Sequence, residues 1–224
     1  GTGTGLFVIN FNGTSAQAVS GAGPATIQDF TVSNAAGVTM NSALTWTGAA
    51  TVNAGTSLAA GAALTNSGAT APAINGTFQV NQGGAASGVN FVYGASGKLV
   101  FNNTSGLTVN NTDPDWPTAS GPPNVTVQNG GGITLGAGAS RTISGTLALG
   151  GGGGGRVTTG ANALTIGSAG TVTGPGSGSY VNGNLQKTVT ISAGAGSQTW
   201  EVGDAALYAP INFATTTGFT NIVL

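Results

Sequence analysis

Short segments in which apolar and polar residues alternate recur along the whole chain. They occur at residues 7–11 (FVINF), 27–32 (IQDFTV), 44–46, 78–80, 91–93, 99–101, 107–109, 125–127, 133–135, 147–149 and 164–166. Alternation with a period of two is typical of strands, and the Gly, Asn, Ser and Pro residues that bound each segment favour turns. Strong helix formers such as Lys, Glu and Arg are scarce. The pattern therefore predicts an all-β chain of very short strands.

Triplets of two apolar residues around a central threonine distinguish a β-solenoid from a β-sandwich or barrel. At residues 107–109, 125–127, 133–135 and 164–166 two apolar side chains flank a Thr, which in a strand places the apolar pair on one face and the Thr on the other. Sandwiches and barrels use strands of about 5 to 6 residues, whereas one wall of a solenoid coil needs only three. We therefore predict a right-handed parallel β-solenoid (β-helix) of roughly nine coils with about 20 residues each.

Proline interrupts this repeat in the middle of the chain. Residues 110–124 include the sequence DPDWP and a Pro-Pro pair, and proline has no N–H to donate to a strand ladder. We interpret this stretch as a loop that bulges from the solenoid. The glycine run at residues 150–155 is interpreted as a wide corner rather than a domain boundary. The predicted organisation is a solenoid over residues 1–192, carrying the loop at 110–124, followed by a C-terminal β module or strand-exchange segment over 193–224.

The composition excludes most enzyme chemistry. The 224 residues include four Lys+Arg, five Asp+Glu, no His and no Cys, whereas acid/base catalysis needs a titrating group, usually His or a tuned carboxylate. A net charge of -1 offers no positive field for nucleic acid or an anionic membrane. We predict no enzymatic activity, no cofactor, no metal, no nucleic acid partner and no membrane insertion. A degradative β-helix enzyme is a third hypothesis, for which five scattered acids do not supply a catalytic face.

Segments near both ends resemble a known family of large secreted surface proteins from Bacteroidetes-like bacteria. The resemblance rests on residues 11–21 (FNGTSAQAVSG), 27–34 (IQDFTVSN), 37–40 (GVTM), 163–167 (ALTIG), 179–187 (SYVNGNLQK), 200–204 (WEVGD) and 208–211 (YAPI). It implies an exported β-solenoid followed by a small β-sandwich-like module, in proteins that serve as surface adhesins, stalks or fibres. Trp200 and Glu201 depart from the Phe and Pro usual in that family. A complete module would need further strands, either from sequence outside this chain or from a neighbour.

The ends of a solenoid carry the functional hypothesis, because unpaired strand edges bind other strands unless charge or proline caps them. The first charged residue is Asp29. A head-to-tail contact that does not close gives a filament. The sequence therefore predicts a structural subunit or segment of an extracellular or cell-surface filament or stalk, whose partners are copies of itself as a homopolymer or tandem repeats. The apolar residues expected at its assembly interface are Phe7, Ile9, Phe11, Phe213, Phe219, Ile222 and Leu224.

The loop at 110–124 carries the alternative hypothesis, an adhesin segment that binds glycans or a surface partner. Asp113 and Asp115 could ligate Ca²⁺ or cap turns in a solvated loop. Trp116 is expected to be exposed, where it could stack on a sugar ring. Threonine rows also suggest an ice-binding surface, although Ser, Asn and Ala interrupt them. We expect Glu201 and Asp204 to pair with Lys187 or Arg156.

Overall fold

The computed structural model describes residues 7–150, 154–191, 196–216 and 219–222. The fold is all-β, a parallel β-solenoid of about nine turns with small two-stranded antiparallel sheets near the C-terminal end of the chain. The predicted all-β parallel solenoid is therefore confirmed. The chain divides into two compact units, which we call unit 1 (Gly1–Val100 and Thr112–Pro122) and unit 2 (Phe101–Asn111 and Pro123–Leu224). Each unit is described by itself.

The strands are short throughout, as the alternation predicts. In unit 1 they are β1 (Val8–Phe11), β2 (Gln17–Val19), β3 (Ala25–Ile27), β4 (Asp29–Val32), β5 (Val38–Met40), β6 (Leu44–Trp46), β7 (Ala50–Val52), β8 (Ser57–Ala60), β9 (Ala63–Asn66), β10 (Ala73–Ile74), β11 (Thr77–Asn81), β12 (Ala85–Ser87) and β13 (Val92–Tyr93). β14 (Lys98–Asn102) spans the division. In unit 2 they are β15 (Leu107–Val109), β16 (Asn124–Gln128), β17 (Ile133–Leu135), β18 (Arg141–Ile143), β19 (Thr146–Leu149), β20 (Val157–Ile166), β21 (Thr171–Thr173), β22 (Val181–Lys187), β23 (Val189–Ile191), β24 (Gly196–Trp200), β25 (Val202–Gly203), β26 (Ile211–Thr215) and β27 (Phe219–Ile222).

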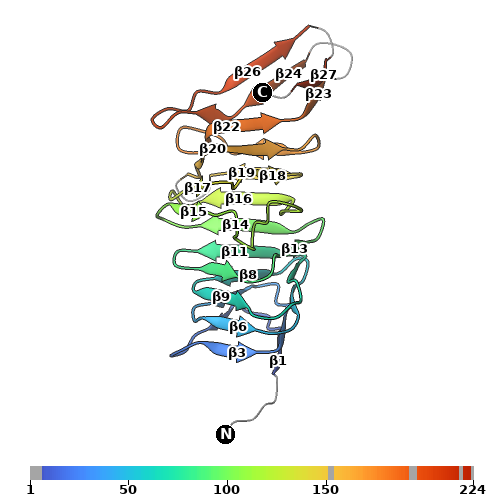
Figure 1. Cartoon of the computed structure of the whole chain (residues 1–224), viewed down its shortest axis with the longest axis vertical. Helices are drawn as coiled ribbons and strands as arrows, with labels where there is room; N and C mark the ends of the chain where they lie inside the picture. The colour runs from blue at the N-terminus through green and yellow to red at the C-terminus, as the bar shows by residue number, and fades with distance from the viewer. Residues whose placement is uncertain (1–6, 151–153, 192–195, 217–218, 223–224) are drawn as a thin grey trace. The chain divides into compact units, whose positions relative to one another are not determined.

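Unit 1 is built from parallel sheets in which every third strand pairs. The strand orders are β1-β4-β7-β10-β13, β2-β5-β8-β11 and β3-β6-β9-β12, and Figure 1 shows β3, β6 and β9 as successive rungs. The coils stack in register, so that Thr45 pairs with Thr26 in the preceding coil and with Thr65 in the following one. Each coil therefore takes about 20 residues, as expected for this spacing of triplets.

Alternation along the strands places the core of unit 1 inside the coils. In β6 the side chains of Leu44 and Trp46 are buried, whereas that of Thr45 is half-buried on the outer face. Aromatic rings meet edge to face inside, with centroids 5.3 Å apart for Phe30 and Trp46. The expectation of one strand at residues 27–32 is wrong, because Gln28 lies at a corner and separates β3 from β4, which belong to different sheets.

Two glycines show why small residues are required at the corners between strands. A Cβ at Gly68 would collide with the carbonyl oxygen of Thr47, and one at Gly84 with the carbonyl oxygen of Ala60. Both carbonyls belong to the preceding coil, about one repeat earlier in the sequence. Any larger residue would therefore force the coils apart at these corners, against the spacing of about 4.8 Å that the strand ladders require.

Unit 2 is also built from parallel sheets, and it contains the predicted threonine triplets. Its parallel strand orders are β15-β17-β20-β22-β25 and β16-β19-β21, and β18 also pairs with β20. β15 pairs with β17 so that Thr108 lies beside Thr134, both exposed. Their neighbours Ile133, Leu135 and Val109 are buried. The inward and outward assignment made from the sequence is therefore confirmed for these triplets.

The pairing changes direction after β22. β25 still pairs with β22 in parallel, whereas β23 pairs with β27 and β24 with β26 as two-stranded antiparallel sheets. The predicted boundary at residue 193 stays a prediction. Of the glycine run interpreted as a corner, residues 151–153 lie outside the described residues.

Candidate functional site

The first coil of unit 1 has one side that no described strand covers. β1, β2 and β3 each occupy an end position in the order of their sheet. Their outer N–H and C=O groups therefore have no ladder partner within the described part of unit 1. An edge of this kind is a template for another strand.

The inward side chains of this coil are less buried than their counterparts one coil later. Ile9 and Phe11 pair with Phe30 and Val32, and Val19 pairs with Met40. These partners are buried, whereas Ile9, Phe11 and Val19 are half-buried. We call Ile9, Phe11 and Val19 the open coil face.

The open coil face continues the interior packing of the solenoid. The ring of Phe11 meets that of Phe30 edge to face, with centroids 6.5 Å apart, and Phe30 in turn meets Trp46. Next to it, Phe7 and Val8 are each 69 % exposed. The open coil face therefore exposes side chains at core positions, which a further parallel coil would bury.

The C-terminal residues predicted for assembly lie on the two antiparallel sheets. In β26, Phe213 is half-buried and Ile211 is 53 % exposed. The backbones of Phe219 and Ile222 pair with β23, and their side chains, like the whole of Leu224, lie outside the described residues. The role of these residues in assembly stays a prediction.

The predicted ligand loop is a packed part of unit 1. The main-chain N–H of Phe91 donates to the carbonyl oxygen of Pro114 at 2.8 Å. Trp116 has 0 % exposure and Asp115 is buried as well, while Asp113 is half-buried. The expectation that Trp116 is exposed is therefore wrong. Proline keeps this segment out of the strand ladders, but it does not prevent the large apolar side chain of Trp116 from being buried in the protein.

Tyr93 anchors this loop through its hydroxyl group. The Oη atom donates to the carbonyl oxygen of Asp115 at 2.5 Å. Burial raises the pKa of the Tyr93 hydroxyl well above its usual range, and the nearby Asp115 carboxylate raises it further. The phenol therefore stays protonated and keeps donating its hydrogen bond at alkaline pH.

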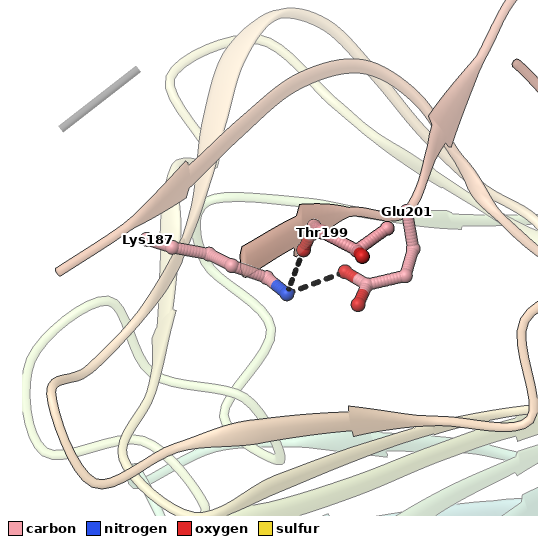
Figure 2. A network of polar contacts seen from close by, with 3 residues as sticks. All are labelled: Lys187, Thr199 and Glu201. Atoms are coloured by element: carbon pink, nitrogen blue, oxygen red, sulfur yellow. Dashed lines mark hydrogen bonds and ion pairs between the residues drawn. The ribbon is translucent and has the colours of Figure 1, made fainter. Parts of the chain in front are cut away.

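A buried ion pair joins β22 to the segment that follows β24 (Figure 2). Lys187 Nζ lies 2.6 Å from Glu201 Oε2, with side chains 9 % and 10 % exposed. The same ammonium donates to the carbonyl oxygen of Thr199 at 2.7 Å and lies 6.0 Å from the centre of the Trp200 ring. The predicted pairing of Glu201 with Lys187 is therefore confirmed, and the pair fixes the chain where antiparallel pairing begins.

The other predicted acid, Asp204, caps a turn instead of pairing with a cation. Its Oδ1 accepts hydrogen bonds from the main-chain N–H groups of Ala206 and Leu207 at 2.7 and 2.8 Å. These bonds lower the pKa of the Asp204 carboxyl. Arg156 donates to the carbonyl oxygen of Ala205 at 2.9 Å, beside this turn.

Two buried asparagines, Asn34 at a coil corner and Asn162 at the irregularity within β20, are structural residues that the sequence did not reveal. Asn34 donates to the carbonyl oxygen of Ser15 at 2.7 Å and accepts from the N–H of Ala36 at 2.8 Å. Asn162 donates to the carbonyl oxygens of Gly136 and Leu135. Asn34 follows the alternating segment at 27–32, whereas Asn162 precedes the one at 164–166, so no shared pattern marks these positions in an Asn-rich chain.

No family model, no curated protein and no solved structure matches the chain. Among the described residues, no group of three or more His, Cys, Asp and Glu is placed to hold a metal ion. A search of the same residues finds no helix long and apolar enough to cross a membrane.

Proposed function

We propose that this chain is a structural segment of an extracellular or cell-surface filament or stalk. In this proposal the open coil face of one copy receives a strand-bearing end of the next copy, so that copies add head to tail. Such a heterologous contact does not close on itself and therefore generates a filament.

The observation that carries the proposal is the open coil face. Ile9, Phe11 and Val19 occupy core positions of the repeat, and a further coil would bury them while pairing the edges of β1, β2 and β3. Among the described residues that precede Asp29, none carries a charged side chain that would repel an added strand. Proteins that need to protect such edges usually place charge, proline or a cap on them.

One feature of the sequence supports a location outside the cell. The chain resembles secreted surface proteins in the segments quoted above. The parallel solenoid itself suits a spacer, since each coil contacts only its neighbours and length scales with coil number.

Glycan binding through the loop at 110–124 has lost its main support. Trp116 is enclosed, so its ring offers no face on which a sugar can stack. Asp115 is buried beside Tyr93. We therefore do not propose this loop as an adhesive surface.

The test is electron microscopy of purified full-length protein together with a pair of matched variants. Phe11→Asp places a charge on the open coil face, whereas Asn10→Asp places the same charge on the exposed outer side of the same strand. We expect long unbranched fibres from the parent and from Asn10→Asp, and none from Phe11→Asp.

Circular dichroism and thermal melting establish that both variants are folded. A second variant, Ile9→Asp, repeats the test if Phe11→Asp fails to fold. A parent protein that stays monomeric at high concentration would contradict the proposal, as would fibres formed equally well by Phe11→Asp.

A further inference from the structure

Unit 2 has a polar depression that the proposed assembly does not use. Its volume is about 310 Å³, and it lies over the outer face of β17 and β20, where Thr134, Thr158, Ser177, Arg156 and Tyr180 line it. Ligand pockets span about 300 to 1,000 Å³. The depression is therefore large enough for a ligand the size of a single saccharide unit.

Arg156 is held in a fixed position at the wall of this depression. One of its terminal nitrogens, Nη1, donates to the carbonyl oxygen of Ala205 at 2.9 Å, and the guanidinium carbon lies 6.0 Å from the centre of the Tyr180 ring. Tyr180 is itself buried and donates to the carbonyl oxygen of Asp204 at 2.8 Å. The guanidinium is therefore preorganised, which reduces the entropy lost when it binds a ligand.

The remaining N–H groups of Arg156 make no further hydrogen bond to the described residues. Arg156 is exposed, whereas the other arginine of the chain, Arg141, is 1 % exposed. A guanidinium presents paired donors that match the two oxygens of a carboxylate or a sulfate. This wall of the depression therefore favours an oxyanion.

Hydroxyl groups also line the depression. Thr134 and Thr158 are register partners in β17 and β20, so their side chains stand side by side on the outer face at about 4.8 Å. Ser177 adds a third hydroxyl group. Each hydroxyl can donate or accept a hydrogen bond, which suits the hydroxyls of a sugar ring.

No acidic side chain among the described residues lines the depression. Asp204 is close in sequence to its rim, but its Oδ1 is engaged by the N–H groups of Ala206 and Leu207. Glu201 is paired with Lys187. An anionic ligand therefore meets the Arg156 charge without a carboxylate in the lining.

We propose that this depression binds an acidic saccharide unit, a hydroxylated pyranose that carries a carboxylate or a sulfate. Arg156 binds the oxyanion, and Thr134, Thr158 and Ser177 bind ring hydroxyls. This inference is independent of filament formation, because none of these residues belongs to the open coil face.

The test is isothermal titration calorimetry of the full chain with methyl glucuronide, glucose 6-sulfate, methyl glucoside and inorganic sulfate. We expect both acidic sugars to bind at least tenfold more tightly than methyl glucoside and than sulfate alone, and to bind more weakly as salt increases. Arg156→Gln should weaken acidic sugar binding at least tenfold, and Thr134→Val should weaken it several-fold. Lys98→Gln, which removes an exposed cation in unit 1, should leave binding unchanged.

Thermal melts of each variant separate a loss of binding from a loss of folding, and Thr134→Val serves if Arg156→Gln does not fold. Equal binding of the neutral and acidic sugars would overturn the role of Arg156. Equal binding of sulfate and glucose 6-sulfate would overturn the role of the hydroxyls. An absence of binding, or binding unaffected by both variants, would overturn the site altogether.

Discussion

Individual buried side chains with polar groups determine how the loop at 110–124 packs on unit 1. Trp116 fills space next to Gly121, where a Cβ would lie 3.1 Å from the indole ring. Tyr93 then bonds the main chain one residue before Trp116, at Asp115. The loop is therefore held by the buried ring of Trp116, by the Tyr93 hydrogen bond and by the hydrogen bond from the Phe91 N–H to the Pro114 carbonyl oxygen.

Replacing Trp116 should destabilise the protein rather than alter binding. Trp116→Ala removes a fully buried ring and is expected to cost about 3 to 5 kcal/mol in free energy of unfolding. Trp116→Phe keeps part of that volume and should cost less. Urea unfolding followed by circular dichroism measures both, and an unchanged midpoint for Trp116→Ala would contradict the burial of this side chain.

The pH dependence of stability should appear outside the range from about pH 4 to 9. Because the pKa of Tyr93 is raised in the folded state, the unfolded chain loses this proton first as the pH rises above the ordinary tyrosine value of about 10. The folded state then binds more protons than the unfolded state, so stability falls with rising pH. Asp204 acts in the opposite sense, because its lowered pKa gives stability that is lost as the pH falls below about 4.

Thermal melts between pH 3 and 11.5 test this dependence. Tyr93→Phe should make the alkaline decrease shallower, and Tyr208→Phe should have a smaller effect of the same sign, since the pKa of Tyr208 is also raised, by burial and by Glu201. A steep change in melting temperature near pH 7 would show that a group other than these controls stability.

At the scale of strands, alternation decides which side chain enters the core. Ile133 is 2 % exposed, while the adjacent Thr134 is exposed. Ile133→Asp buries an unpaired charge and should cost several kcal/mol, whereas Thr134→Asp should change stability by about 0.5 kcal/mol or less. Chemical denaturation of the two variants measures the difference, and equal losses would refute the inward and outward assignment.

The ion pair at the start of antiparallel pairing gives a second test at this scale. Lys187→Met alone leaves Glu201 buried without its partner and should cost about 3 to 5 kcal/mol. The double variant Lys187→Met with Glu201→Leu removes both charges and should be more stable than either single variant. A double-mutant cycle that shows additive losses would contradict a coupled pair.

The sequence predicted these strands well because their signal is local. In a triplet such as Leu107-Thr108-Val109, the alternation alone indicates which side chains point into the core and which points outward. The pairing of Lys187 with Glu201 was predictable because the chain has only nine charged residues, so each charge has few possible partners. The packing of Trp116 and the corner hydrogen bonds of Asn34 depend on residues in other coils. Contacts between coils leave no periodic pattern in the sequence. The proline and asparagine residues therefore predicted loops but not how those loops pack.

At the scale of the whole molecule, the proposed assembly involves both the open coil face and the C-terminal strands. Deleting residues 219–224 removes β27 and with it the partner of β23. We expect the truncated chain to keep the circular dichroism spectrum of the solenoid and to lose fibre formation, because β27 is no longer there to pair with a strand of another copy. Fibres from the truncated chain as abundant as those from the parent would show that these strands take no part.

The most direct test of head-to-tail assembly is light scattering of mixtures. A Phe11→Asp chain lacks a working open coil face but keeps its other end, so it should add to a growing polymer and stop it. The average mass of the parent polymer should therefore fall steadily as the fraction of Phe11→Asp rises, while Asn10→Asp leaves it unchanged. A parent that scatters as a monomer at every concentration, or a polymer mass unaffected by Phe11→Asp, would contradict the account.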